Sequence, residues 1–150
     1  MAKIKSFQPI KGQIIWKVHF SSAIEQVYTA LTTDKGRKTY WAEATKEKDG
    51  FIEFTFFNYP IIKSKIIAQK PPELFKIEYF ETEVTFKLAA TADGETDLTL
   101  INIVPDEALK QEVTAGWVSV LLAMKAAVDF GIDLRNHHPE RTWDNGYLDN

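Results

Sequence analysis

The feature that most constrains the fold of this chain is a change in the spacing of its apolar residues at Pro105. From residue 43 to residue 104, apolar and polar side chains alternate, which is typical of β-strands with one buried face. Beyond Pro105, apolar residues recur every three or four positions as far as Gly131, which predicts a long helix. The chain is therefore expected to combine a large sheet with one long helix.

Short turn sequences divide the alternating region into six expected strands: 43–47, 51–57, 61–69, 74–80, 82–91 and 95–104. Strands joined by such short loops pair antiparallel, because parallel pairs need long crossovers. The turn sequences are Asp49-Gly50, Asn58-Tyr59-Pro60, Pro71-Pro72 and Asp93-Gly94. Alternation gives five of the strands a buried face: Ile52, Phe54 and Phe56; Ile62, Ser64 and Ile66; Phe75, Ile77 and Tyr79; Val84, Phe86 and Leu88; and Thr96, Leu98, Leu100 and Asn102.

The segment before residue 43 predicts one more strand and two short helices. Residues 13–20 alternate in the same way, so that they form the first strand. Ser22 and Glu25 have the spacing of a capping box, which predicts a helix that ends near Leu31. A second short helix is expected to begin at Asp34 and to end near Tyr40-Trp41. The buried face of the first strand is expected to hold Ile14, Trp16, Val18 and Phe20.

The long helix is expected to run from an N-cap at Asp106 to Gly131. At about 1.5 Å per residue it would be about 40 Å long, which is more than two short helices could cover. The sheet must therefore curve around it. The inward residues are expected to be Val113, Trp117, Val120, Leu121, Met124, Ala127 and Val128.

Together these elements predict an α+β fold in which a curved antiparallel sheet of about seven strands wraps around a long C-terminal helix. A chain of 150 residues suits a single domain over 1–150, with its core in 13–131. The remaining segment, 132–150, has few periodic apolar residues. We expect this tail to dock through Trp143 and Tyr147.

Charge and composition exclude several classes of function. Eighteen basic and 21 acidic residues give a net charge of −3, which does not suit binding to nucleic acid. The chain has no cysteine, so it has no disulfide, thiol nucleophile or cysteine-ligated metal site. Its seven glycines are too dispersed for a phosphate-binding loop or a nucleophile elbow.

The sequence also predicts a cytoplasmic protein without a membrane span. Met1–Gly12 lacks the apolar core of a signal peptide. The longest apolar run is interrupted by Lys125 and Asp129, and it falls short of the roughly 20 residues that a span needs.

No catalytic residue, metal or cofactor is expected. His19 lies on the polar face of the first strand, and His137 and His138 neighbour Asp133 without completing a set of metal ligands. A weak metal site there, with Glu140 or Asp144, is the alternative. A catalytic carboxylate working near neutral pH would have to be buried, whereas alternation turns Glu53, Glu78, Glu81 and Glu83 outward.

Four segments of the chain carry a resemblance to a known family. They are Val27-Tyr28-Thr29-Ala30-Leu31-Thr32-Thr33-Asp34 with Tyr40-Trp41; Lys70-Pro71-Pro72-Glu73-Leu74; Gly94-Glu95-Thr96-Asp97-Leu98-Thr99-Leu100; and Gly116-Trp117 with Leu121, Met124-Lys125 and Val128. Their order and spacing resemble the SRPBCC superfamily, which includes START domains and birch-pollen allergens. Within it the chain resembles the homologues of the heat-shock protein 90 ATPase activator. The resemblance covers residues 13–131 and implies the helix-grip fold.

Two features depart from the family pattern. The glycine-rich turn that follows the tryptophan is reduced to Lys48-Asp49-Gly50, and the segment Asn136–Tyr147 is additional. A cavity rim inferred from relatives would therefore not transfer to this chain.

Three functions are compatible with this reading. The first is non-catalytic binding of a small hydrophobic or amphipathic ligand in a hollow between the sheet and the long helix. The second, implied by the resemblance, is a chaperone-linked interaction in the stress response. The third, also implied by the resemblance, is an enzyme similar to polyketide cyclases or dehydratases. The sequence predicts no oligomeric state.

The expected ligand site consists of aromatic and aliphatic side chains with a few polar groups that would orient a ligand. The alternative is that the same rings simply fill the core. The aromatic hairpin tip Phe57-Asn58-Tyr59-Pro60 would cover the mouth of the hollow or contact another protein. The inward polar residue Thr82 belongs with this site as well. The residues expected to line it are Trp41, Phe54, Phe56, Ser64, Phe75, Tyr79, Phe86, Leu98, Leu100, Asn102, Trp117, Leu121 and Met124.

Overall fold

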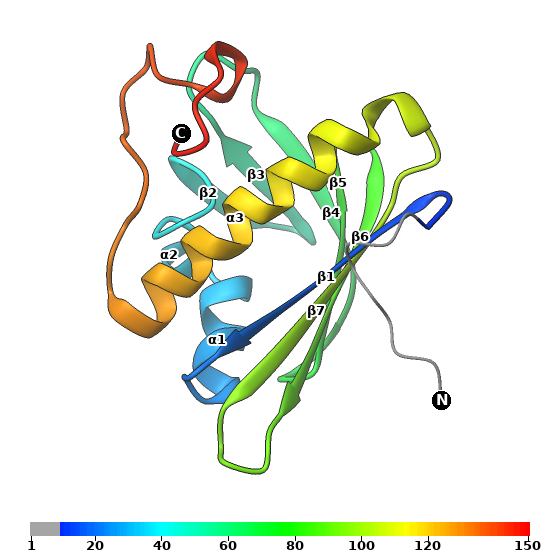
Figure 1. Ribbon diagram of the computed structural model, residues 1–150, viewed down its shortest axis with the longest axis vertical. Helices are drawn as coiled ribbons and strands as arrows, with labels where there is room; N and C mark the ends of the chain where they lie inside the picture. Colours follow the sequence, from blue (N-terminus) through cyan, green and yellow to red (C-terminus); the bar gives the residue numbers. More distant parts are fainter. Residues whose placement is uncertain (1–9) are drawn as a thin grey trace.

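A seven-stranded antiparallel sheet curves around one long helix in the computed structural model, which describes residues 10–150 (Figure 1). The prediction about a signal peptide concerns Met1–Gly12 and so lies mostly outside the described residues. In chain order the elements are β1 (Gln13–Phe20), α1 (Ile24–Thr32), α2 (Asp34–Arg37), β2 (Ala44–Lys48), β3 (Phe51–Thr55), β4 (Ile62–Lys70), β5 (Leu74–Tyr79), β6 (Thr82–Ala90), β7 (Thr96–Ile103), the 3-10 turn η1 (Glu107–Leu109), α3 (Lys110–Phe130) and the 3-10 turn η2 (Trp143–Asn145).

The strands lie in the order β1-β7-β6-β5-β4-β3-β2, and each pairs antiparallel with its neighbours. The predicted α+β class and curved sheet are therefore confirmed. Trp16 on β1 and Phe86 on β6 both lie opposite Leu100 on β7. Alternate residues of these three strands therefore share one face of the sheet. Strand β1 occupies an edge of the sheet because it pairs only with β7 among the described strands.

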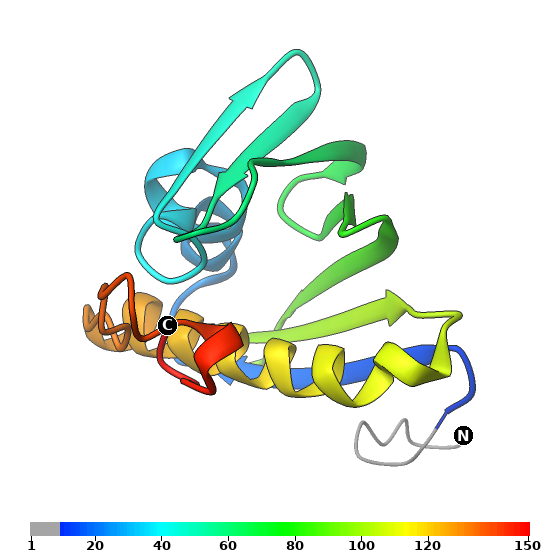
Figure 2. The ribbon, with the colours of Figure 1, turned by 90° about the horizontal axis from the view of Figure 1, so that it is seen from above.

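Helix α3 lies across the concave side of the sheet, while α1 and α2 cover one end of it (Figure 2). Trp117, Leu121, Ala123 and Met124 are its buried residues, and they join the core formed by the inner faces of the strands. By length and by a mean hydropathy of 1.5 alone, Glu107–Phe130 could cross a membrane. Its inner face packs on the sheet, so α3 is the core helix of this fold.

The capping box predicted at Ser22 was wrong, whereas the cap predicted at Asp106 forms. The Ser22 hydroxyl donates to Asp129 on α3 and accepts no hydrogen bond from the first turn of α1, whose N-cap is Ala23. The bond to a distant carboxylate replaces the predicted local one. Asp106 does cap a helical turn, since it accepts from the amide of Ala108, but that turn is η1. Helix α3 is therefore shorter than predicted at its start, and it ends as predicted at Gly131, whose φ is 65°.

The tail after Gly131 runs back over α3, and the C-terminus lies beside the middle of that helix (Figure 1). Trp143 docks as predicted, with its indole N–H donating to Glu112 at 3.0 Å. The hydroxyl of Ser119 donates to the carbonyl of Leu148 at 2.6 Å. Tyr147 was expected to dock too, but its side chain is exposed, and the backbone carbonyl of Leu148 makes the contact at this end of the tail.

Candidate functional site

Trp41 lies at the centre of the predicted ligand site. Its ring contacts those of Phe54, Tyr79, Phe86 and Trp117, with centroids 5.0, 5.4, 5.8 and 5.9 Å away. These rings come from the loop after α2, from three strands and from α3. The contacts are tilted or edge-to-face, which is the favourable geometry for aromatic pairs.

Each polar atom at the tryptophan rings has a partner. The indole N–H of Trp41 donates to the Tyr79 hydroxyl at 3.1 Å, and that of Trp117 donates to the Asn102 side-chain oxygen at 2.9 Å. The Asn102 amide donates in turn to the Thr82 hydroxyl at 3.0 Å. Burial raises the pKa of the Tyr79 hydroxyl, so this group stays protonated in the physiological range. The network is neutral and has no group suited to general base catalysis.

Ser64 differs from these polar residues. It lies on the inner face of β4 and is 1% exposed, yet its hydroxyl has no hydrogen-bond partner within residues 10–150. A buried hydroxyl without a partner is unfavourable, because it has lost its bonds to water without replacement. Among the predicted site residues, Ser64 is the one whose buried side-chain oxygen has no hydrogen-bond partner within residues 10–150.

The structure brings the thirteen predicted residues together in the core. Phe56 and Tyr79 are half-buried, and the other eleven are buried. The rings contact one another across the space between sheet and helix. The two surface hollows described next are lined by other residues, so a ligand-binding role for these thirteen residues stays a prediction.

Two shallow hollows open on the surface. The first, of about 440 Å³, lies between α2 and the end of α3 and is lined by Lys35, Lys38, Thr39, Ala127, Gly131, Ile132 and Asp133. The second, of about 460 Å³, lies between the β3–β4 connection and the β5–β6 turn. Its lining is Tyr59, Pro60, Ile61, Ile62, Lys63, Glu78, Phe80 and Glu81. The exposure of Tyr59 confirms that part of the aromatic hairpin tip remains outside the core.

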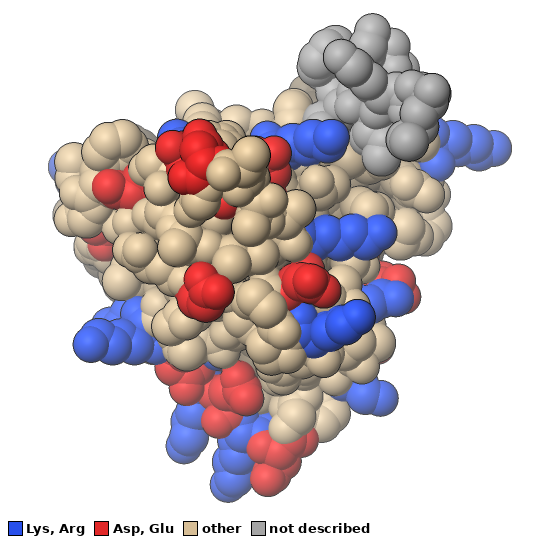
Figure 3. All heavy atoms as spheres, turned by 90° about the horizontal axis from the view of Figure 1, so that it is seen from below, with Lys and Arg blue, Asp and Glu red and all other residues tan. Residues whose placement is uncertain are grey.

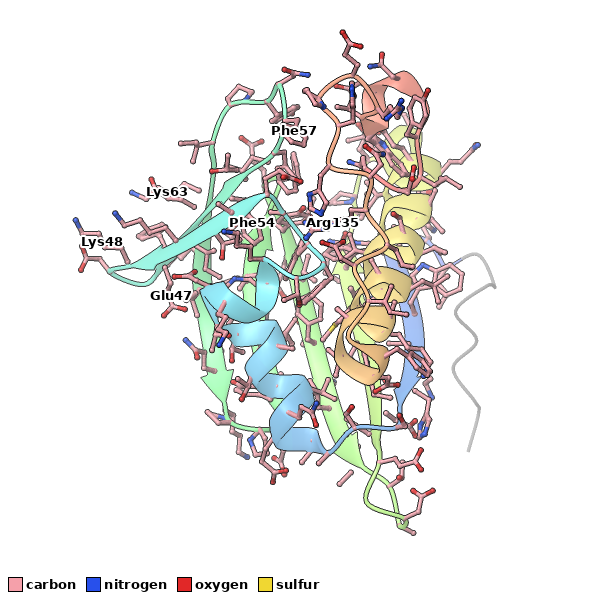
Figure 4. All side chains as sticks on the ribbon, turned by 90° about the vertical axis from the view of Figure 1, so that its left-hand side faces the viewer. Glu47, Lys48, Phe54, Phe57, Lys63 and Arg135 are labelled. Atoms are coloured by element: carbon pink, nitrogen blue, oxygen red, sulfur yellow. The ribbon has the colours of Figure 1, made fainter. Side chains whose placement is uncertain are left out.

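Arg135 fixes the tail to the loop that carries Trp41, a role that the sequence analysis missed. Its guanidinium donates to the carbonyls of Ala42 at 2.7 Å and Lys38 at 2.5 Å, and it pairs with Asp133 (Figure 4). The one sequence signal was the Asp-x-Arg spacing, which allows the local ion pair but says nothing of the distant carbonyls. The buried arginine thereby connects the segment after α3 to the backbone of the loop that carries Trp41.

His137 forms a second connection between the tail and the sheet. Its two ring nitrogens lie 2.7 Å from an oxygen of Asp133 and 2.8 Å from one of Glu43. The hydrogen bond with Asp133, and then that with Glu43, raise the pKa of His137. Burial raises the pKa of Asp133, but hydrogen bonds from Arg135 outweigh this and lower it to about 2.

Metal binding was the alternative reading of these histidines. Within residues 10–150, no three side chains of the metal-binding types form a cluster that could hold an ion. Both nitrogens of His137 instead face carboxylates, and the ring nitrogen of His138 accepts from the amide of Glu140. The observed geometry is that of ion pairs that hold the tail.

All of the exposed large apolar side chains except that of Ile67 on β4 fall into two groups. Eight of the twelve described ones follow residue 108, on η1, α3 and the tail, and three line the second hollow. The first group had a signal in the sequence, because residues 113–124 contain no charge on any side of the helix. Basic and acidic side chains are interspersed on the face shown in Figure 3, without a large field of one sign.

No protein-family model matches this sequence, and neither does any curated protein. Solved structures do match the fold. A protein of Staphylococcus saprophyticus has a TM-score of 0.72 and 20% identity, over 82% of this chain and 96% of its own. The Aha1 dimer of Colwellia psychrerythraea has a TM-score of 0.70 and 23% identity, over 79% of this chain and 97% of its own.

A third similar structure is CalU16 of Micromonospora echinospora, with a TM-score of 0.64 and 21% identity over 76% of this chain and 72% of its own. At these identities the comparisons establish the fold alone. The chain has the helix-grip fold, in agreement with the superfamily that its motifs resemble.

Proposed function

We propose that this protein is a non-catalytic binding protein that acts through contact with other proteins. The proposal rests on one observation, which is the apolar surface formed by the outer side of α3 and the tail. We define the α3 surface as Val118, Leu122, Phe130, Ile132 and Leu148, all of which are exposed. Large exposed apolar patches on monomers commonly mark interaction sites.

The geometry of α3 supports this reading. Val118 and Leu122 are one helical turn apart, and Leu148 lies beside Ser119, whose hydroxyl donates to its carbonyl. Leu122 is 55% exposed although it lies in the core helix of the fold. Removing an exposed apolar side chain from water is favourable, so a partner that covers it is bound more tightly.

The finer proposal is that the partner is a chaperone. Its support is the family that the sequence motifs resemble, together with the structural similarity to a protein named Aha1. The test is the ATPase rate of the cognate heat-shock protein 90, measured with and without this protein. We expect the wild-type protein to raise that rate by at least twofold.

Two variants decide whether the α3 surface is responsible. Leu122→Glu should abolish the stimulation, because it places a charge in the contact while keeping a good helix former. The matched control is Ile67→Glu, since Ile67 is also exposed but lies on β4. Absence of stimulation by the wild type contradicts the chaperone-linked function, and stimulation by the Leu122 variant contradicts the role of this surface.

A second candidate function, binding of a small amphipathic ligand in the core, is supported by Ser64 alone. The ligand would place a polar atom at its hydroxyl and displace rings such as Phe56 and Tyr79, which are only half-buried. Titration of isotopically labelled protein with palmitate and with naringenin should shift the amides of Ile52 and Ser64. Ser64→Ala should weaken that binding at least fivefold, and a lack of shifts with both probes contradicts this candidate.

The cyclase-like alternative has no comparable support. The buried polar residues of the described segment 10–150 are Arg37, Ser64, Thr96, Asn102 and Arg135. None of these residues is an acid or a histidine, which general acid–base chemistry in a core would use. The carboxylate of Asp129 is also buried, but it is bonded to Ser21, Ser22 and Lys125 at the end of α3.

A further inference from the structure

Strand β4 changes partners along its length, which opens a fork in the sheet. Its first half, Ile62–Lys65, pairs with β3, and its second half pairs with β5. The last pair between β4 and β5 is Ile66 with Ile77, whereas β5 continues to Tyr79 in contact with β6. We call the space between Ile62–Lys65 and Glu78-Tyr79 the fork. Within residues 10–150, no strand lies between them to pair with the edge of β4 or of β5 that faces the fork.

The backbone of β4 presents unpaired groups to the fork. The amide of Ile66 donates to the carbonyl of Gly50, on the side of β3, at 2.8 Å. Backbone groups alternate in direction along a strand, so those of Lys63, beyond the last pair of β4 with β5, point to the opposite side, toward the fork. The N–H of Lys63 therefore faces the fork, as it would face a neighbouring strand. An unpaired edge of this kind is a template for a strand from another chain.

The second hollow lies at this fork, and its lining combines apolar with charged side chains. Tyr59, Ile61 and Phe80 line it and are 49%, 61% and 46% exposed. Its volume of about 460 Å³ is large enough for an apolar or aromatic side chain of a partner. The hollow thus lies directly beside the start of β4, where a strand added to it would run.

The wall formed by Phe80 is held in place at a conformational cost. Phe80 and Glu81 have φ angles of 48° and 61°, which bulky residues rarely adopt. The Phe80 ring contacts Tyr79, Tyr59 and Phe56, with centroids 4.7, 5.9 and 6.4 Å away. These contacts offset the cost and fix the ring at the rim, so the wall is formed before any partner binds.

Opposite charges flank the hollow. Lys63 lines it from β4 and points away from the molecule, in contrast to Phe54 on β3 (Figure 4), and its ammonium lies 4.5 Å from the centre of the Phe51 ring. Glu78 lines it from β5 and Glu81 from the β5–β6 turn. A segment with an acidic residue on one side of its apolar residue and a basic residue on the other would match these charges.

We propose that the fork binds an extended peptide segment of a partner protein. The segment adds as a strand to the Ile62–Lys65 edge of β4 and places an apolar or aromatic side chain in the second hollow. An apolar small molecule could use the hollow but not the unpaired backbone groups, so the strand edge favours a peptide. The inference goes beyond the proposed function, because it concerns elements other than the α3 surface.

The test uses two capped heptapeptides of the sequence Thr-Glu-Val-Phe-Val-Lys-Thr, one of them N-methylated at both valines. Each is titrated into isotopically labelled full-length protein while amide shifts are followed. We expect the unmodified peptide to shift the amides of Ile62–Lys65 and Glu78–Glu81. The N-methylated peptide, which lacks those two hydrogen-bond donors, should bind at least tenfold more weakly. Equal binding of both peptides, or no shifts at the fork, overturns the proposal.

Protein variants locate the site. Ile61→Lys should weaken binding of the unmodified peptide at least fivefold, whereas Ile67→Lys, on β4 outside the hollow, should leave it unchanged. Tyr59→Ser serves as a second variant of the hollow, with the same expected loss. Leu122→Glu should have no effect on peptide binding, so a failure here is distinguishable from a failure of the proposed function. Unchanged affinity in both hollow variants contradicts the proposal.

Discussion

At the scale of single residues, Asn102 connects the sheet to the helix. Its amide donates to the Thr82 hydroxyl and to the Glu83 carbonyl, both at 3.0 Å, and its oxygen accepts from Trp117. Asn102→Leu would leave the indole N–H of Trp117 buried without a partner. We expect the free energy of unfolding to fall by about 2–4 kcal/mol, measured by urea denaturation. Thr99→Val, an outward change on the same strand, should alter it by less than about 0.5 kcal/mol, and equal losses in both variants would contradict this role.

Alternation along the strands was enough to predict that Ser64 and Asn102 point inward, and both are buried. It could not predict that one would be fully bonded and the other left without a partner. The partners of Asn102 come from β6 and α3, so they depend on strand register and on the rotation of the helix. Both are properties of the assembled core and leave no local pattern in the sequence.

At the scale of elements, Asp129 joins the end of α3 to the β1–α1 connection. Its buried carboxylate accepts from the amides of Ser21 at 2.9 Å and Ser22 at 3.2 Å, and from Lys125 at 3.0 Å. Burial raises the pKa of Asp129, but the donors from Ser21, Ser22 and Lys125 outweigh it and lower the pKa to about 2, from an ordinary value of 3.8. A lowered folded-state pKa means that the carboxylate stabilises the fold above about pH 4.

This stabilisation should disappear as the pH falls from about 4 to about 2. We expect Asp129→Asn to lower the free energy of unfolding by about 1–3 kcal/mol at pH 7. Urea denaturation across pH 2–7 should show the difference from the wild type shrinking below pH 4. Asp144→Asn, at an exposed position of the tail, is the control and should show no such change. A difference that is constant down to pH 2 would show that the charge of Asp129 is not what matters.

The same contact explains the wrong capping prediction. The spacing of Ser22 and Glu25 is a local signal, whereas the carboxylate that bonds to Ser22 is 107 residues away. Strand and helix positions were predictable because periodic burial is also local. The local caps at Asp106 and Gly131 were predictable for the same reason, whereas the bond between Ser22 and Asp129 was not, since it depends on how the elements meet.

At the scale of the whole molecule, the periodic pattern predicted the topology and left the occupancy of the interior open. A curved sheet and one helix are compatible with a hollow or with a filled core. Whether the interior is hollow or filled depends on whether its rings contact each other. The rings of Trp41 and Phe54 do so, with centroids 5.0 Å apart. The tail is a second feature that periodicity could not place, since polar contacts of Arg135 and His137 hold it.

The tail makes the helix and the far side of the sheet one connected unit, and Arg135 is the residue on which this depends. Its bonds to the carbonyls of Lys38 and Ala42 have no replacement in Arg135→Ala, so the tail should detach. We expect a glutamate-specific protease to cleave after Glu140 at least fivefold faster in this variant, and the amides of residues 38–43 to exchange faster. Arg141→Ala, next to the cleavage site but exposed, controls for local sequence effects. Equal cleavage rates in the wild type and the Arg135 variant would mean that His137 and Trp143 hold the tail without it, so that the loop carrying Trp41 does not depend on Arg135.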